Sequence, residues 1–161
     1  MGLFDFMKGK KGIVLAAPVK GECIPISEVA DPTFAEEILG KGMAIKPAGN
    51  QFFAPADGTI TTVFPTGHAI GMTTQDGVEI LMHVGLDTVQ LKGQFFDTKV
   101  EANQSVKKGD LILEAEIEEI SKAGYDTVMP MIICNSSDYS KIECKNSGTV
   151  EPGDDVITCT A

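Results

Sequence analysis

The sequence contains no arginine and no tryptophan, and all 13 of its basic residues are lysines. Without a guanidinium group the chain has neither an arginine finger nor a bidentate clamp for a phosphate. Positive charge is scarce overall, because 23 Asp and Glu residues leave a net charge of −10. Such a chain repels a nucleic-acid backbone and an anionic membrane surface, so nucleic-acid binding is excluded.

The four cysteines form no C-x-x-C pair, so the sequence has neither a zinc ribbon nor a redox motif. We expect them to be reduced and structural. The longest apolar run, Ile13–Ala17, stops at Pro18, well short of the ~18 residues that a membrane span needs. Because the start of the chain also lacks the pattern of a secretory signal, we expect a cytoplasmic protein.

Residues 1–12 are expected to form a flexible N-terminal segment. Its side chains Leu3, Phe4, Phe6 and Lys8 allow at most weak peripheral contact with a membrane. The remainder, residues 13–161, has the length and composition of one globular domain.

Short hydrophobic segments separated by turn residues indicate an all-β protein, an antiparallel β-sandwich or barrel-sandwich. Two short helices are predicted over residues 34–39 and 117–123, and neither is long enough to organise the fold. Ten strands are predicted over residues 13–16, 22–26, 43–46, 58–64, 68–73, 78–84, 111–116, 128–133, 141–144 and 156–159.

Two pairs of segments repeat within the chain. Ala17–Ile24 is similar to Ala54–Thr61, and Val106–Asp110 is similar to Val150–Asp154. Each pair combines a turn with a strand, so we predict two related β layers that enclose one core.

Several common catalytic motifs are missing. The sequence has no G-x-x-x-x-G-K-[ST] loop for a nucleotide, no G-x-S-x-G nucleophile elbow and no H-E-x-x-H zinc helix. Any phosphoryl group that the protein handles must therefore arrive on another molecule.

The only two histidines, His68 and His83, lie in one predicted hairpin whose turn contains Asp76–Gly77. A two-residue loop would place His83 opposite Ile70, with His68 on the diagonal, and a four-residue loop would place the two histidines directly opposite. Either register puts both imidazoles on one face, about 5 Å apart when directly opposed and about 7–8 Å apart on the diagonal. A three- or five-residue loop would separate them.

Alternation along the second strand of this hairpin identifies the face. The buried side consists of Val78, Ile80, Met82 and Val84. His83 then points to the other side, beside Leu81 and Ile70. An apolar ring around two imidazoles is typical of a docking surface.

A neutral imidazole is a competent nucleophile near pH 7, because its unperturbed pKa is about 6.5. In one interpretation His83 attacks a phosphoryl group, His68 donates a hydrogen bond to the developing charge, and Thr66 orients His68. Gly85 leaves room for the backbone beside the acceptor, and Asp87 fixes a tautomer or contacts a cation on a partner. A metal site made of the same two imidazoles and a third ligand fits the spacing equally well.

Two stretches resemble a known family. Residues Gly77–Val89 resemble the active-site signature of the glucose-type enzyme IIA of the bacterial phosphoenolpyruvate-dependent sugar phosphotransferase system, and Phe64–Ile70 resemble its second histidine motif. Asp31–Glu36, Gly40–Pro47 and Leu91–Gly93 also fit. The similarity runs from about residue 14 to the C-terminus.

The resemblance implies an antiparallel β-sandwich with a shallow, apolar-rimmed depression. It implies that the phosphocarrier protein HPr phosphorylates His83 at an imidazole nitrogen and that a cysteine on the IIB domain of a sugar permease receives the group. His68 would stabilise the phosphate without carrying it, and Thr66 would bond to His68. Family position also assigns partner contacts to Asp31, Phe34, Phe64, Ile70, Leu81, Gly85, Asp87 and Val89.

The resemblance leaves two alternatives to a phosphoryl carrier. Some members of the family bind zinc through both active-site histidines and a partner's glutamate, and they inhibit permeases and kinases when unphosphorylated. The relay requires no cofactor, so we expect zinc at His68 and His83 only at a partner interface, in a regulatory protein. The second alternative is a biotinyl- or lipoyl-type carrier domain, suggested by the repeated turns, although no lysine has the setting that such a domain gives its modified lysine.

Overall fold

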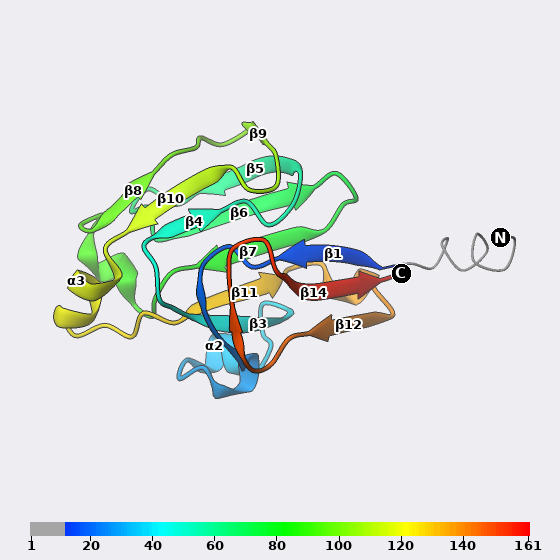
Figure 1. Cartoon of the computed structure of the whole chain (residues 1–161), viewed down its shortest axis with the longest axis horizontal. Coiled ribbons are helices and arrows are strands. Elements are labelled where there is room, and N and C mark those ends of the chain that lie inside the picture. The colour runs from blue at the N-terminus through cyan, green and yellow to red at the C-terminus, as the bar shows by residue number, and fades with distance from the viewer. Residues whose placement is uncertain (1–11) are drawn as a thin grey trace, which may run out of the picture.

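Antiparallel strands are the main regular elements of the computed structural model, which describes residues 12–161 (Figure 1). The largest sheet has eight strands, in the spatial order β13 (Thr149–Val150), β2 (Gly21–Pro25), β3 (Lys41–Pro47), β11 (Met129–Ile133), β7 (Glu79–His83), β6 (Ala69–Thr74), β5 (Gly58–Val63) and β9 (Ser105–Val106).

Two three-stranded sheets complete the architecture. One has the order β1 (Ile13–Ala16), β14 (Asp155–Thr160) and β12 (Lys141–Cys144), and the other β4 (Gln51–Phe53), β10 (Leu111–Ala115) and β8 (Phe96–Thr98). The helices are α2 (Pro32–Ala35) and α3 (Ile117–Lys122), with 3-10 turns η1 (Ile26–Glu28), η2 (Thr88–Leu91) and η3 (Ser136–Asp138). The predicted all-β class is confirmed.

The predicted N-terminal segment, residues 1–12, lies outside the described residues except for Gly12. Within residues 12–161, every helix is too short or too polar to cross a bilayer. All four cysteines are free thiols, as the sequence predicts.

The internal repeats occupy equivalent places in the fold. β13 pairs with β2 in the first repeat, and β9 pairs with β5 in the second. The turns before these pairs also match, because the N–H of Ala17 donates to the carbonyl of Asp154 at 2.7 Å and that of Ala54 to the carbonyl of Asp110 at 2.8 Å. In each turn the aspartate side chain accepts a backbone N–H at 2.8 Å. The internal repeat is therefore confirmed, with its two copies at opposite edges of the eight-stranded sheet. That the copies form two separate β layers stays a prediction.

The main core lies between the sheets and contains one face of β7. Val78, Ile80, Met82 and Val84 are each at most 3% exposed, as their alternation predicts. Methionines at facing positions fill the centre, because Met131 pairs with Met43 on one side and with Met82 on the other. The opposite face of β7 is thereby directed away from the core.

A second, smaller apolar cluster covers that opposite face near β11. Ile24, Ala44 and Ile132 contribute from the sheet, and Phe34 of α2 packs over them. Figure 1 shows α2 beneath β3 at the edge of the molecule. Together with the main core on its other face, this cover leaves all five residues of β11 buried. It also places Phe34 against His83 at the end of β7.

All ten predicted strands overlap observed ones, and four strands were missed. β4, β8, β9 and β13 have only two or three residues, too few for alternation to be recognised. The first helix begins earlier than predicted because the side chain of Asp31 accepts the N–H of Thr33 and Pro32 occupies the first turn. It ends at Ala35, before Glu37 adopts a left-handed conformation with φ 59°.

The predicted register of the histidine hairpin is wrong. Ala69 pairs with His83, and Ile70 pairs with Met82. The loop consists of three residues, 75–77, because the N–H of Thr74 donates to the carbonyl of Val78 at 2.9 Å. The hydroxyl of Thr74 also accepts the N–H of Val78 at 3.0 Å, and this bond favours the three-residue loop.

Candidate functional site

The two histidines meet despite this register. His83 is the last residue of β7, and His68 lies in the bend just before β6. Their ring centroids are 4.8 Å apart and the rings are nearly perpendicular, at 78°.

The bend before β6 explains how His68 reaches the face of His83. Gly67 has φ +74°, and its N–H donates to the carbonyl of Phe64 at 2.7 Å, closing a tight turn. The carbonyl of His68 still accepts the N–H of Val84 at 2.7 Å. The backbone is thus anchored to β7, while the side chain lies outside the strand and does not follow its alternation.

Each imidazole is oriented through its Nδ1 atom. Nδ1–H of His83 donates to the carbonyl of Gly85 at 2.7 Å, because a carbonyl can only accept. Nδ1 of His68 is 2.6 Å from the hydroxyl of Thr66. Nε2 of His83 therefore carries the free lone pair.

Both Nε2 atoms reach the surface. Within residues 12–161 neither has a hydrogen-bond partner, and no buried side-chain nitrogen or oxygen there lacks one. His68 is only 3% exposed, so very little of this residue meets solvent.

Burial keeps both imidazoles uncharged at neutral pH. It lowers the pKa of His68 to about 4, with a further contribution from the positive charge that His83 carries when protonated. Burial also lowers the pKa of His83, although the Gly85 carbonyl and the carboxylates of Asp31 and Asp87 act in the opposite direction. The site therefore presents two neutral rings with a negative rim.

Three phenylalanine rings surround the pair. Phe34 lies 5.1 Å from His83, and Phe64 and Phe96 lie 5.4 and 6.4 Å from His68, all between ring centroids. Such a shell lowers the local dielectric constant and strengthens electrostatic contacts to any group held there. Phe96 was missed because it is distant in sequence and no motif marks it.

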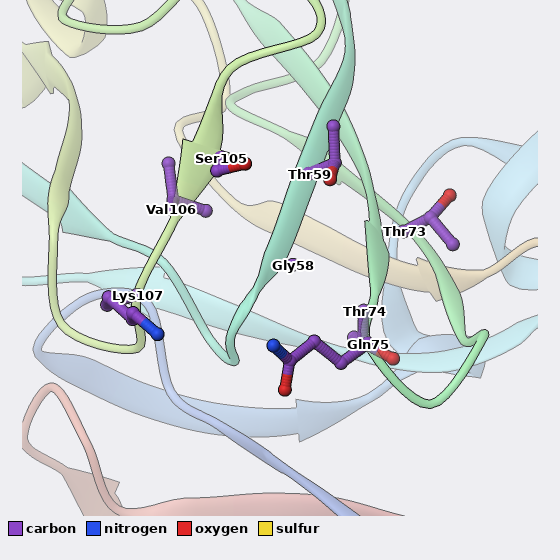
Figure 2. A pocket seen from close by; sticks show the side chains of 8 residues that line it. All are labelled: Gly58, Thr59, Thr73, Thr74, Gln75, Ser105, Val106 and Lys107. Atoms are coloured by element: carbon purple, nitrogen blue, oxygen red, sulfur yellow. The ribbon is translucent and has the colours of Figure 1, made fainter.

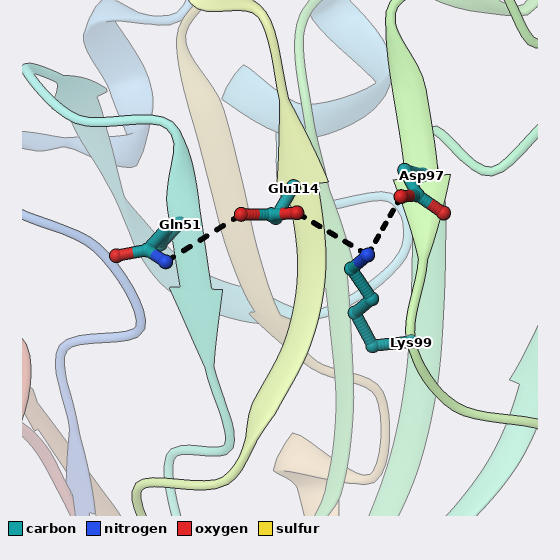
Figure 3. A network of polar contacts seen from close by, with 4 residues as sticks. All are labelled: Gln51, Asp97, Lys99 and Glu114. Carbon is teal, nitrogen blue, oxygen red and sulfur yellow. Dashed lines mark hydrogen bonds and ion pairs between the residues drawn. The ribbon is translucent and has the colours of Figure 1, made fainter.

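A polar network holds the strand that carries Phe96. Lys99 Nζ lies 2.7 Å from a carboxylate oxygen of Asp97 and 3.3 Å from one of Glu114, and Gln51 donates to Glu114 at 3.5 Å. Figure 3 shows this row crossing β4, β10 and β8. The network ties Asp97, next to Phe96, to the neighbouring strands.

The structure places most of the predicted partner residues at or near the pair. Asp31, Phe64 and Leu81 are half-buried, and Asp87 and Val89 are exposed. Phe34 is buried against His83, and Gly85 contributes its carbonyl. Whether these residues contact a partner stays a prediction.

The prediction that Ile70 lies beside His83 and contacts a partner is wrong. Ile70 is 1% exposed and belongs to the main core, because it pairs with Met82 and shares its inward direction. It was placed beside His83 by the wrong register, and its side chain cannot contact a docked protein in this structure.

Sequence reasoning also missed exposed apolar side chains close to predicted partner residues. Ile38 is 67% and Leu39 41% exposed, in the loop after α2. A shallow groove of about 270 Å³ on β5–β7 shares Phe64 and Leu81 with the site and extends to Cys134. The groove thus extends the apolar surface that begins at Phe64 and Leu81.

A separate cavity lies at the other end of the hairpin. Its volume is about 270 Å³, and Figure 2 shows it between β9, β5 and β6, lined by Thr59, Thr73, Gln75 and Ser105 among others. Thr74 is about 17 Å from the start of β6. This cavity contains no histidine and does not belong to the site.

The histidines alone do not complete a metal site. Among residues 12–161, no group of three or more His, Cys, Asp or Glu side chains is placed to hold a metal ion. The chain offers two nitrogen ligands at this place, so a partner would have to supply the rest.

We expect Gly85→Ala to disrupt the orientation of His83. Gly85 has φ +84°, and a Cβ there would lie 2.5 Å from Cγ2 of Thr88 and 3.0 Å from the carbonyl of Asp126. Gly77→Ala is the matched control, since its φ is +92° but nothing lies within 4 Å of the added Cβ. Both should lose about 1–2 kcal/mol of stability from the left-handed backbone, but only Gly85→Ala should change the ¹⁵N shifts of His83. Unchanged shifts in Gly85→Ala would contradict the assigned hydrogen bond.

The lowered pKa values predict a specific pH dependence. His68 should titrate near pH 4 and His83 below pH 6.5. Because the unfolded chain binds these protons more tightly, the stability contributed by the neutral rings is complete above pH 6.5 and is lost as the pH falls toward the folded-state values. Imidazole NMR titration measures both transitions, and a His68 transition at or above pH 6.5 would contradict the burial argument.

Comparisons with known proteins identify the family of this chain. The family described as "phosphoenolpyruvate-dependent sugar phosphotransferase system, EIIA 1" matches residues 13–139. The chain is 42% identical over 153 residues to the PTS system glucose-specific EIIA component of Buchnera aphidicola, covering 95% of this chain and 94% of that protein. The glucose permease IIA structure from Mycoplasma capricolum superposes with a TM-score of 0.84 at 37% identity, over 93% of this chain and 97% of that one.

Other relatives are longer. The PTS system beta-glucoside-specific EIIBCA component of Dickeya chrysanthemi is 44% identical over 137 residues, which is 85% of this chain but only 22% of that protein. The sequence resemblance is thereby confirmed. The chain belongs to the EIIA type 1 family of the phosphoenolpyruvate-dependent sugar phosphotransferase system and is a phosphotransferase component.

Proposed function

We propose that Nε2 of His83 accepts a phosphoryl group from phosphohistidine on HPr and passes it to a cysteine of a IIB domain during sugar uptake. The observation that carries this proposal is the pairing of two neutral imidazoles whose Nδ1 atoms are both engaged and whose Nε2 atoms reach solvent. We take residues 13–161 as the domain that performs the transfer. Family membership removes support from the lipoyl-type alternative.

In the acceptance step the Nε2 lone pair of His83 attacks phosphorus. A new N–P bond forms as the bond from phosphorus to the donor's imidazole nitrogen breaks, and that bond's electron pair returns to the donor nitrogen. The His83 ring gains positive charge while its Nδ1 proton stays in place. The Gly85 carbonyl at 2.7 Å and the carboxylates of Asp31 and Asp87 stabilise that charge.

His68 stabilises the phosphoryl oxygens. If the Thr66 hydroxyl donates to Nδ1 of His68, the ring proton lies on Nε2 and can be donated to the phosphoryl group. A pKa of about 4 keeps His68 from becoming a competing cation at neutral pH. Thr66 therefore selects the tautomer that makes His68 a donor.

The surroundings of the pair suit a basic, partly apolar partner. Leu81, Phe64 and Val89 supply apolar contact, and Asp31 and Asp87 supply negative charge at the rim. The net charge of −10 would steer basic partners toward the chain. We place this exchange in the cytoplasm, where HPr acts.

A second candidate function is a zinc-assisted regulatory complex. The rings of His68 and His83 are both fixed through Nδ1, as those of ligating histidines generally are. To ligate zinc, His68 takes the other tautomer, in which its Nδ1–H donates to the hydroxyl of Thr66 and Nε2 carries the lone pair. Zinc would supply a bridge to a permease or kinase that contributes a carboxylate. The two ligands fit such a bridge only when the partner completes it.

Substitution of the histidines separates their roles. Incubation with phosphoenolpyruvate, enzyme I and HPr should add one phosphate to the wild-type chain and none to His83→Ala. His68→Ala should still accept phosphate but pass it on poorly, because the stabilising donor is lost. Phosphopeptide mapping without acid locates the group, and normal incorporation into His83→Ala would contradict the assignment.

Zinc binding is tested with the ion alone. Zn²⁺ added to the isolated chain should shift the Nε2 signals of both histidines and bind weakly, because two ligands are too few. His68→Gln should remove the shift at His83. Perturbation of other residues only, with both imidazoles unchanged, would refute the zinc proposal.

A further inference from the structure

A short segment before β11, residues Asp126–Val128, forms two backbone hydrogen bonds with the turn that orients His83. The carbonyl of Asp126 accepts the N–H of Leu86, and the carbonyl of Val128 accepts the N–H of Gly85, both at 2.9 Å. We call Asp126–Val128 the strap. It connects α3 to β11, far in sequence from the histidine motifs.

The carboxylate of Asp126 shapes the strap itself. Its Oδ1 accepts the N–H of Val128 at 2.9 Å, two residues along the chain. This local bond is an Asx-type turn, which aspartate makes because its short side chain can replace a backbone acceptor. It holds the two strap carbonyls in the arrangement that grips the Gly85–Leu86 turn.

One planar peptide group, between Gly85 and Leu86, is hydrogen-bonded both to the strap and to the imidazole of His83. The carbonyl of Gly85 and the N–H of Leu86 belong to the same peptide unit, which is rigid. Its N–H side donates to Asp126, and its carbonyl side accepts Nδ1–H of His83 at 2.7 Å. A rotation of this peptide would break both bonds together.

A second restraint acts on the peptide before it. The hydroxyl of Thr88, which is fully buried, donates to the carbonyl of Val84 at 2.6 Å. Thr88 belongs to the same local turn, whereas the strap approaches from another part of the chain. Because Asp126 is exposed, a substitution there removes its side-chain hydrogen bond without disturbing the core.

We propose that Asp126 is a positioning residue for phosphoryl transfer: by folding the strap onto the Gly85–Leu86 peptide, its carboxylate keeps the proton of His83 on Nδ1 and the lone pair on Nε2. The inference rests on the proposed function of His83. Asp126 touches neither the reacting nitrogen nor the phosphoryl group. Its effect passes through the backbone.

Three variants test this role. Asp126→Ala removes the acceptor for the N–H of Val128, whereas Asp126→Asn removes the charge but retains an acceptor oxygen. Asp110→Ala is a matched control, because Asp110 accepts a backbone N–H at 2.8 Å in a turn distant from the site. Imidazole ¹⁵N NMR of the unphosphorylated protein gives the tautomer of His83, and rapid-mixing assays with phosphorylated HPr give the acceptance rate.

We expect Asp126→Ala to increase the Nε2–H tautomer of His83 and to lower the acceptance rate about tenfold, equivalent to about 1.4 kcal/mol. Asp126→Asn and Asp110→Ala should behave like the wild type. Asp126→Ser, whose hydroxyl makes the same turn more weakly, should be intermediate and serves if the alanine variant folds poorly.

Two outcomes would overturn the inference: wild-type tautomer and rate in Asp126→Ala, or equal impairment in Asp126→Asn, which would assign the effect to charge. Absence of phosphate on His83 in the wild type would instead reject the proposed function. The tautomer measurement needs no phosphorylation and would still decide the role of Asp126.

Discussion

The hydrogen bond from Nδ1–H of His83 to the carbonyl of Gly85 is the contact on which the site depends. It assigns the proton to one ring nitrogen and leaves the other as the nucleophile. The carbonyl is in place only because Gly85 adopts φ +84° against Thr88 and the strap. A side chain at this position would collide with its neighbours. The chemistry of the imidazole is therefore set by backbone geometry, and the glycine is required by its conformation as well as by lack of space.

Two chemically identical side chains take different roles because their Nδ1 partners differ. A carbonyl can only accept, so it makes His83 a nucleophile at Nε2, whereas a hydroxyl can donate, so Thr66 can make His68 a donor at Nε2. Burial holds both rings neutral and prevents them from repelling each other. The fold contains two copies of a short repeat, yet only the copy with β5 adjoins the hairpin of β6 and β7 that carries this pair. Phe34 of α2 also packs against His83 at the end of β7, next to this pair.

The sequence predicted the histidine pair, the direction of β7 and the repeated halves, because alternation and turn chemistry are local signals. It did not predict the hairpin register. The bond that favours the three-residue loop, from the N–H of Val78 to the hydroxyl of Thr74, leaves no recognisable pattern in the sequence. The predicted register was wrong, and His68 lies in a bend and not in the predicted strand. At His68 these two errors offset each other, because the bend at Gly67 brings its ring to the face of His83. At Ile70 they do not, because Ile70 follows the strand into the core. Phe96 and the strap come from distant segments, so only the three-dimensional fold reveals them.

The position of phosphorus on the ring tests this account most directly. In the phosphorylated protein labelled with ¹⁵N-histidine, ¹⁵N–³¹P coupling identifies the nitrogen that carries the phosphoryl group. We predict coupling to Nε2 of His83, with its Nδ1 proton still present and bonded to the Gly85 carbonyl. Coupling to Nδ1 of His83, or to either nitrogen of His68, would contradict the central claim.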